Sequence, residues 1–269
     1  MEIRKKLEQR NLLLSQVRGF FEQKKILEVD TPLIRKFSVT DPYMRAFSVL
    51  SASGTHRGFL QTSPEYAMKE LLSLGSGDIF QLGKMFRCDE KGANHHTEFT
   101  LLEWYRVGWD QYALMDECAE LLHSVLGPLP VFSTSYAEAF ISQLGHDPLG
   151  ISLQRLQQLA ATQLGELPKD LLFDDYLSLL FSEKIEPSFN PKQITFVTDF
   201  PKSQASLAKT RINSQGVEVA ERFEIYVGGL ELANGFYELT DANQQAARFK
   251  RDNELRAASG WLKLRSMIS

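Results

Sequence analysis

The chain has 269 residues, of which 43% are hydrophobic, so it can bury one large core or a core with an inserted segment. Its formal net charge of -4 fits a soluble enzyme and argues against a protein that lives on nucleic acid, which would normally carry a basic excess. Cys88 and Cys118 are too few for a disulfide framework, no apolar run approaches ~20 residues, and the charged N-terminus lacks an apolar signal core. We therefore expect a cytoplasmic protein that does not enter a membrane.

The first part of the chain predicts two helices with a short strand between them. Apolar residues at near-helical spacing, with charges between them, predict a helix over residues 3–24. The stretch at residues 26–34 predicts a strand that ends near its proline, which cannot donate to a ladder. A second helix, over residues 62–75, has Ser63 as a candidate N-cap and Gly75 as its stop signal.

Two β-rich runs follow, at residues 78–90 and 98–107, with a polar segment between them. This pattern predicts an antiparallel hairpin with a long loop. Residues 110–127 then predict a helix with one apolar face.

The middle of the chain, residues 133–190, is mostly helical in pattern and reads as an insert over the sheet. Strands resume at residues 194–200. Two more strands, within residues 222–239, form a hairpin that turns at Gly228-Gly229.

A last helix is predicted over residues 240–260, where Thr240 or Asp241 can cap the first turn. Antiparallel strand pairs with helices grouped around them favour an α+β fold over the regular βαβ alternation of a Rossmann-type sheet. Neither GxxxxGK(S/T) nor GxGxxG occurs in the chain, so both common phosphate-binding loops are excluded.

The first predicted hairpin carries residues that fit a nucleotide site. Strand alternation places Arg87 and Asp89 on one face of its first strand, and Phe99, Glu103 and Tyr105 on one face of its second. A cation suits a phosphate, and a phenylalanine ring suits the face of a purine. The same spacing also fits a solvated hairpin with cross-strand ion pairs, so the residues alone leave both readings open.

A second acidic group lies near the C-terminal end of the strand-rich region. Glu231 and Glu238 stand in a mostly apolar run, where a carboxylate is disfavoured unless it is exposed or paired with a cation. A break at Asn234-Gly235 would turn both carboxylates inward, whereas an edge strand would leave them in water. The residues fit both arrangements.

Several long motifs resemble one enzyme family. "FRCDEKGANHHTEFTLLEWY" resembles motif 2 of the class II aminoacyl-tRNA synthetases, and "FFEQKKILEVDTPLI" is similar to motif 1, the helix and strand that build the family dimer. "TSPEYAMKELL" and "GLELANGFYELTDANQQAARF" are similar to the amino-acid-binding segments of lysyl-tRNA synthetase. A closer resemblance, covering residues 1 to about 260, is to the elongation factor P lysine ligases, which "LQTSPEYAMK", "FPKSQASLAK" and "VAERFEIYVGGLELANGFYELTDA" carry.

The resemblance implies a two-step reaction. ATP, accompanied by Mg²⁺, reacts with lysine or preferably (R)-β-lysine to give an aminoacyl-adenylate, and the acyl group passes to a lysine side chain of elongation factor P. It also implies a homodimer and no tRNA substrate. The catalytic domain would span residues 1–260, with residues 133–190 as a helical insert.

The resemblance also implies a role for individual residues. Arg87 would contact the α-phosphate and act in catalysis, and Glu231 would help to hold Mg²⁺. The implied ATP-binding residues are Arg87, Cys88, Asp89, His96, Phe99, Glu231 and Leu232. The implied substrate-binding residues are Ser63, Pro64, Glu65, Glu103, Tyr105, Asn234 and Glu238.

The motif 2 segment departs from the family pattern at three positions. The usual glutamate is Asp89, the usual asparagine is His96, and the usual proline is Thr97. A histidine can still donate a hydrogen bond to a nucleotide. The adjacent pair His95 and His96 is not expected to hold a metal, because neighbouring residues on an extended loop point apart and the sequence places no third ligand nearby.

The end of the chain also departs from the family. Class II enzymes finish with motif 3, a glycine-rich strand and helix whose arginine contacts the γ-phosphate, and no GxGxxR-like segment occurs here. We therefore expect a core that lacks the motif 3 segment and ends in a divergent tail at residues 261–269. Besides the ligase, this leaves two alternatives open: a catalytically impaired remnant that binds lysine, nucleotide or a partner, and a lysyl-tRNA synthetase-like fragment.

Overall fold

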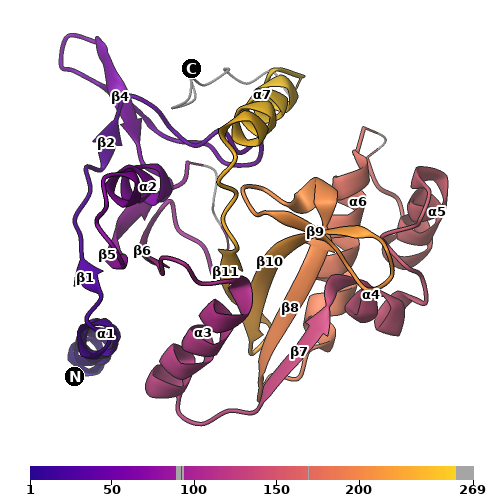
Figure 1. The fold of residues 1–269 in the computed structure, drawn as a ribbon, viewed down its shortest axis with the longest axis horizontal. Coiled ribbons are helices and arrows are strands. Elements are labelled where there is room, and N and C mark those ends of the chain that lie inside the picture. The colour runs from indigo at the N-terminus through magenta and orange to yellow at the C-terminus, as the bar shows by residue number, and fades with distance from the viewer. Residues whose placement is uncertain (89–91, 93, 169, 259–269) are drawn as a thin grey trace. The chain divides into compact units, whose positions relative to one another are not determined.

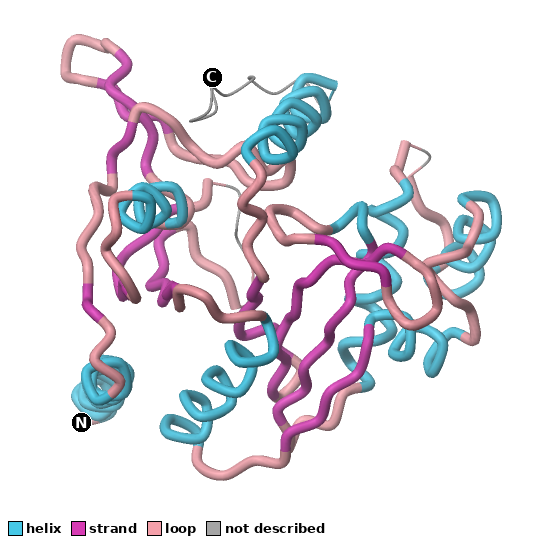
Figure 2. Tube along the Cα trace, in the orientation of Figure 1, coloured by secondary structure: helices cyan, strands magenta, loops and turns pink. Residues whose placement is uncertain are grey.

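The computed structural model describes residues 1–88, 92, 94–168 and 170–258. The chain divides into two compact units: unit 1 contains Met1–Gly108 and the described residues from Thr240 onward, and unit 2 contains Trp109–Leu239. Helices and mostly antiparallel strands alternate irregularly along the chain, which confirms the α+β prediction (Figure 2). Among the described residues, no helix has the length and apolar character needed to cross a membrane. The predicted boundaries of the catalytic domain and of its insert stay predictions. The predicted tail at residues 261–269 lies outside the described residues.

In the part of the chain that the structure describes, unit 1 contains two three-stranded sheets and three helices (Figure 1). The strand order is β1-β5-β6 in the first sheet and β2-β4-β3 in the second. Its helices are α1 (Glu2–Gln23), α2 (Glu65–Ser73) and α7 (Ala242–Ala258). Its strands are β1 (Leu27–Glu28), β2 (Ile34–Arg35), β3 (Ser48–Leu50), β4 (His56–Leu60), β5 (Ile79–Phe86) and β6 (Glu98–Tyr105).

The predicted hairpin of unit 1 is confirmed. Strands β5 and β6 pair antiparallel over their whole length, from Ile79 opposite Tyr105 to Phe86 opposite Glu98. Helix α1 covers one face of the hairpin: the ring of Phe21 stacks on Phe80 at 4.5 Å between centroids. Burying these aromatic faces anchors the helix and fixes which side of the hairpin it covers.

Two local predictions for unit 1 are wrong. Residues 26–34 do not form one strand, because β1 pairs with β5 and β2 pairs with β4, so the stretch between them connects two different sheets. Ser63 does not cap the second helix, since Pro64 occupies the N-cap position and no side chain caps the first turn. Gly75 does follow the helix, with a positive φ of 86°.

Unit 2 contains one five-stranded sheet with the order β11-β10-β8-β7, to which β9 is added beside β10. Strand β7 runs parallel to β8, and the other pairs are antiparallel. The strands are β7 (Val131–Ser135), β8 (Ile194–Pro201), β9 (Thr210–Ile212), β10 (Glu218–Val227) and β11 (Leu230–Phe236). The helices are α3 (Gln111–Leu126), α4 (Tyr136–Leu144), α5 (Leu153–Leu164), α6 (Phe173–Leu180), a π-helix (Phe181–Ile185) and the 3₁₀-helices Glu186–Ser188 and Lys202–Gln204.

The middle of unit 2 is helical, as predicted, but its helices begin at Tyr136 rather than at residue 133. Residues 131–135 instead form β7, because they complete the sheet by pairing with β8. The helices pack on the sheet through an aromatic core in which Tyr136 stacks on Phe181 at 4.6 Å and contacts Phe200 at 5.1 Å. A parallel pair requires a long crossover, and this helical segment supplies it.

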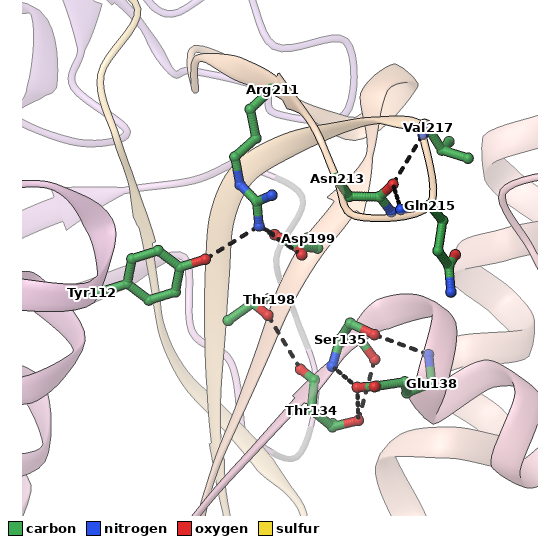
Figure 3. A network of polar contacts seen from close by, with 10 residues as sticks. All are labelled: Tyr112, Thr134, Ser135, Glu138, Thr198, Asp199, Arg211, Asn213, Gln215 and Val217. Carbon is green, nitrogen blue, oxygen red and sulfur yellow. Dashed lines mark hydrogen bonds and ion pairs between the residues drawn. The ribbon is translucent and has the colours of Figure 1, made fainter.

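A polar network ties the elements of unit 2 together (Figure 3). Arg211 on β9 donates to both carboxylate oxygens of Asp199 on β8, at 2.7 and 2.8 Å, and to the hydroxyl of Tyr112 on α3 at 3.2 Å. Burial raises the pKa of Asp199, although the charge of Arg211 acts in the opposite direction. In the same view, Ser135 and Glu138 form a reciprocal capping box at the start of α4.

The second predicted hairpin is also confirmed. Strands β10 and β11 pair antiparallel, and the turn between them is Gly228-Gly229, with φ values of 63° and 79°. Two positive φ angles in succession are what a tight hairpin turn requires, and glycine adopts them without strain. The last predicted cap is confirmed as Asp241, whose carboxylate accepts the N–H of Gln244 at 2.8 Å.

Candidate active site

The structure brings Phe99, Glu103 and Tyr105 to one face of the β5–β6 hairpin, as predicted. Directly opposite residues on an antiparallel pair share a face, and these three lie opposite Met85, Gln81 and Ile79. The opposite face carries Phe80 and Trp104, and both rings contact Phe21 of α1. The polar face is therefore the one that α1 leaves uncovered.

Arg87 extends the polar face just beyond the end of β5. Its N–H donates to the carbonyl of Thr97 at 2.9 Å, which keeps it in register with the partner strand. Its guanidinium lies 5.0 Å from the centre of the Phe99 ring. Its Nε donates to the carbonyl of Thr62 at 3.3 Å. The cation and the aromatic ring that the sequence singled out are thus in contact.

The contact with Thr62 links this hairpin to the start of α2, where Ser63, Pro64 and Glu65 lie. Glu65 stands in the first turn of the helix, where the helix dipole favours a negative charge. Its carboxylate is paired with the ammonium of Lys69 at 2.7 Å, and both side chains are about four-fifths buried. Burial, followed by the charge of Glu65, raises the pKa of the neighbouring Tyr66 to about 12.

Glu103 and Tyr105 form the second polar pair of this face. The Tyr105 hydroxyl donates to Oε1 of Glu103 at 2.9 Å, and both side chains are half-buried. A carboxylate whose position is fixed by a phenol is suited to hold an ammonium group.

The remaining residues predicted from motif 2 are placed less uniformly. Cys88 is half-buried, and its N–H donates to the carbonyl of Arg45 at 2.8 Å. His96 is exposed. Asp89 lies outside the described residues.

In unit 2, the structure shows no break at Asn234-Gly235, one of the two arrangements that the sequence left open. Strand β11 runs through both residues, and the irregularity lies earlier, where Ala233 pairs with Ile225 and Glu231 pairs with Tyr226, so that Leu232 is the extra residue of a bulge. The strand passes close to the ring of Phe223 at Gly235, because glycine has no Cβ. A Cβ at this position would lie only 2.3 Å from that ring. Glycine is the residue that allows this close approach.

The bulge determines how the predicted residues of β11 are presented. Glu231, Leu232 and Asn234 are exposed, whereas Glu238 is half-buried and forms a β-bridge with Ala208. Glu231 lies opposite Tyr226 and Asn234 lies opposite Glu224, so both share a face with the polar residues of β10. The two glutamates therefore differ in exposure: Glu231 is exposed and Glu238 is half-buried.

Sequence reasoning missed a buried polar cluster on β10. Arg222 donates to Glu224 at 2.5 Å, the Tyr226 hydroxyl donates to the same carboxylate, and Glu224 is buried. Burial, and then the charge of Glu224, raises the pKa of both Tyr226 and Glu186. The signal was present in "RFEIY", where polar residues alternate with Phe223 and the following isoleucine at the spacing of one strand face.

A metal site built wholly of protein side chains is absent from the described residues, since no group of three or more histidine, cysteine, aspartate or glutamate side chains lies close enough together. A Mg²⁺ ion that travels with ATP needs only one or two carboxylates, because phosphate oxygens and waters complete its octahedron. The exposed carboxylate of Glu231 fits that more modest role.

The chain is similar to proteins of a known family. The family model described as "tRNA synthetases class II (D, K and N)" matches residues 1–262. A protein of Pseudoalteromonas translucida named "Elongation factor P–(R)-beta-lysine ligase" is 46% identical over 260 residues, which cover 94% of this chain and 80% of the relative. A protein with the same name from Vibrio cholerae is 47% identical, over 94% of this chain and 80% of its own length. One from Photorhabdus laumondii is 44% identical, over 93% of this chain and 78% of its own length. These matches confirm the resemblance seen in the motifs, and the chain belongs to the class II tRNA synthetase family that this model describes.

Proposed function

We propose that this protein is a ligase that uses ATP to activate lysine or (R)-β-lysine as an aminoacyl-adenylate and transfers the acyl group to a lysine side chain of elongation factor P. The observation that carries the proposal is the similarity to ligases of that name, which extends over 93–94% of the chain and includes every segment that holds a candidate site residue. The contact of Arg87 with Phe99 supports a nucleotide site on the same hairpin.

In the first step, a carboxylate oxygen of the amino acid attacks the α-phosphorus of ATP, and pyrophosphate leaves. We assign Arg87 to the α-phosphate, where its fixed charge would stabilise the negative charge that grows in the transition state. Phe99 would stack on the adenine. A ring has two faces, so this stacking is compatible with the guanidinium contact on the other face.

The amino acid is a dication apart from its carboxylate, and a site for it needs acidic groups. We assign Glu65, with Ser63 and Pro64 beside it, to one amine of the substrate. In unit 1, Tyr105 is assigned to the second ammonium, supported by Glu103. In unit 2, Glu238 and Asn234 remain proposed as substrate-binding residues. The Glu65–Lys69 and Tyr105–Glu103 contacts support this assignment, because they show carboxylates that already accept hydrogen bonds from a cation and from a phenol.

Mg²⁺ bound with ATP would offset part of the phosphate charge, and Glu231 is the residue proposed to hold it. Cys88, Asp89, His96 and Leu232 are proposed to line the nucleotide through their backbone or side chains.

In the second step, the ε-amine of a lysine on elongation factor P attacks the carbonyl carbon of the adenylate. AMP leaves with the bonding electron pair, and the new amide nitrogen loses a proton to water. The acceptor is a protein amine, so we expect no tRNA in the reaction. We expect the reaction to take place in the cytoplasm.

We also propose that the protein is a homodimer through residues 12–34. Four large apolar side chains in this range are exposed in the single chain: Leu12, Leu13, Leu27 and Ile34. An exposed apolar surface of this kind is typical of a protein–protein interface.

The proposal is tested by ATP–pyrophosphate exchange with lysine and with (R)-β-lysine, followed by mass spectrometry of elongation factor P after incubation with the ligase. We expect exchange with both amino acids and a mass increase of one lysyl group on the acceptor protein. An acceptor whose target lysine is replaced by arginine is the matched control. Binding of lysine and ATP without any exchange would contradict the proposal and support the non-catalytic alternative.

A further inference from the structure

Helix α7 holds, with one of its faces, a segment of unit 1 that is distant from it in the sequence (Figure 1). Phe249, Asp252 and Arg256 follow one another at intervals of three and four residues, so they lie on the same face of the helix. Phe249 and Arg256 are its buried residues. An arginine that is only 5% exposed on a helix otherwise rich in charge calls for a specific partner.

Arg256 has two such partners in one turn. Its Nη1 donates to the carbonyl of Asp41 at 2.8 Å and to the carbonyl of Met44 at 2.9 Å. The turn is closed by its own hydrogen bond, from the N–H of Met44 to the carbonyl of Asp41 at 3.3 Å. One buried cation therefore bridges both ends of this turn, which we call the 41–44 turn. Such bonds from a charged donor are stronger than those between neutral groups.

The 41–44 turn is connected directly to the hairpin that carries Arg87. The next residue, Arg45, accepts the N–H of Cys88 through its carbonyl at 2.8 Å. Cys88 follows Arg87 in the chain, and the N–H of Arg87 is bonded on the other side to Thr97. The end of β5 is thus held by its partner strand and by the segment that Arg256 holds.

The other two residues of this helix face act on the same surroundings. Thr40, which precedes the 41–44 turn, donates to the carboxylate of Asp252 at 3.0 Å. The ring of Phe249 meets Tyr66 edge to face, with 5.8 Å between centroids. Tyr66 follows Glu65, so α7 contacts the surroundings of both the proposed phosphate residue and the proposed amine residue in unit 1.

We propose that Arg256 is a positioning residue for catalysis. Through the 41–44 turn and the hydrogen bond from Cys88 to Arg45, it fixes the end of β5 so that the guanidinium of Arg87 is held where the α-phosphate is expected. This inference rests on the proposed function for the role of Arg87. Arg256 itself is not assigned a contact with substrate.

A positioning role and a merely structural role predict different kinetics. Arg87 is assigned to charge that develops in the transition state, so misplacing it lowers kcat more than it raises the KM for ATP. Loss of general stability would instead lower the amount of folded protein and leave kcat per folded molecule unchanged. The kcat–KM split of a folded variant therefore separates the two roles.

The first experiment does not depend on activity. The chain has two cysteines, and Cys118 is only 3% exposed while Cys88 is half-buried beside Arg87. The rate at which a disulfide reagent labels Cys88 therefore reports on the end of β5, Cys118 reports on opening of unit 2, and urea unfolding of each variant reports on loss of stability. The variants are Arg256→Met, which removes both hydrogen bonds, and Arg256→Lys, which keeps a cation. Lys250→Met, on an exposed position of the same helix, is the matched control.

We expect Arg256→Met to label at Cys88 about 10-fold faster than the wild type, since two charge-assisted bonds are lost. Cys118 should label at the wild-type rate in every variant. Arg256→Lys should fall between the wild type and Arg256→Met, and Lys250→Met should match the wild type. Unchanged labelling of Cys88 in Arg256→Met would overturn the inference.

The second experiment measures ATP–pyrophosphate exchange in the same variants. We expect Arg256→Met to lower kcat about 10-fold or more, because small displacements at a reacting centre have effects of this size, with little change in the KM for ATP. Faster labelling with an unchanged kcat would overturn the positioning role and leave the proposed function intact. If the wild type shows no exchange, the proposed function fails and the positioning role with it, while the labelling result still decides whether Arg256 holds the end of β5. If Arg256→Met does not fold, Arg256→Lys is judged by the same two measurements.

Discussion

The close approach of Gly235 to Phe223 leads to a sharp prediction about stability. A methyl group added at Gly235 would lie 2.3, 2.6 and 3.0 Å from three carbon atoms of the Phe223 ring. Carbon atoms in ordinary contact are ~3.5–4.0 Å apart, so the methyl group cannot be accommodated unless the ring or the strand moves by about 1 Å. The ring has little room to move, because Phe223 is 1% exposed and packs against Phe196 at 6.0 Å between centroids.

The size of the effect follows from two opposing terms. Overpacking a buried site costs about 1–3 kcal/mol. Replacing glycine by alanine also restricts the unfolded chain, which stabilises the native state by about 0.4–1 kcal/mol. We therefore expect Gly235→Ala to lower the free energy of unfolding by about 1–2 kcal/mol.

Urea unfolding followed by circular dichroism measures this change, with two alanine variants as controls. Gly83→Ala is matched for strand position and meets nothing closer than 3.6 Å, and Gly150→Ala lies in the same unit and meets nothing within 4 Å. Both should be as stable as the wild type or slightly more stable. Phe223→Leu in the Gly235→Ala background should recover part of the loss, as a double-mutant cycle would show. Equal stability of Gly235→Ala and the two controls would refute the reasoning.

Three further predictions concern single groups of the molecule. Burial raises the pKa of Asp252 from 3.8 to about 6, so the native state holds the proton of this carboxyl more tightly than the unfolded chain does, and the free energy of unfolding falls as the pH rises through about 6. Asp252→Asn should remove this pH dependence between pH 4 and 7 in urea titrations and raise the free energy of unfolding at pH 7 by about 1 kcal/mol, a figure reduced for partial exposure. Under the proposed role of Glu238, Glu238→Ala should abolish lysine recognition and leave ATP binding largely intact, because removing a carboxylate from a half-buried ammonium site costs ~2–5 kcal/mol, and equal losses in calorimetric titrations with the two ligands would contradict this. Leu12→Glu combined with Leu27→Glu should shift the protein from dimer to monomer in sedimentation at micromolar concentration, and a wild type that is already monomeric there would count against the dimer.

The features that the sequence predicted well are those decided by neighbouring residues. The turn at Gly228-Gly229 follows from two residues that adopt a positive φ. The common face of Phe99, Glu103 and Tyr105 follows from strand alternation alone, once the hairpin is recognised. The candidate site in unit 1 could be read from the sequence for the same reason, since most of it lies on one hairpin and on the first turn of one helix.

The features that the sequence did not predict depend on partners far along the chain. Residues 26–34 divide between two sheets because their partners, β5 and β4, are chosen by long-range packing. The bulge falls at Leu232, and β11 continues through Asn234-Gly235, where Phe223 of the opposite strand lies against the glycine. Arg256 resembles a solvent-facing arginine in its own helix, and only the fold shows the two carbonyls that bury it.

Unit 1 is built from two stretches of chain that are separated in the sequence by unit 2, and this has a consequence for how the protein is synthesised. Arg256 meets Asp41 across 215 residues of chain, and the whole of unit 2, Trp109–Leu239, is synthesised between them. At a synthesis rate of about 5–20 residues per second, the 41–44 turn leaves the ribosome on the order of 10–40 s before α7 follows. During that time the β5–β6 hairpin can form from its own residues, whereas the turn beside it has no cation to bridge its carbonyls. A nascent chain that stops anywhere within unit 2 would therefore carry Arg87 on a strand whose end is held from one side only.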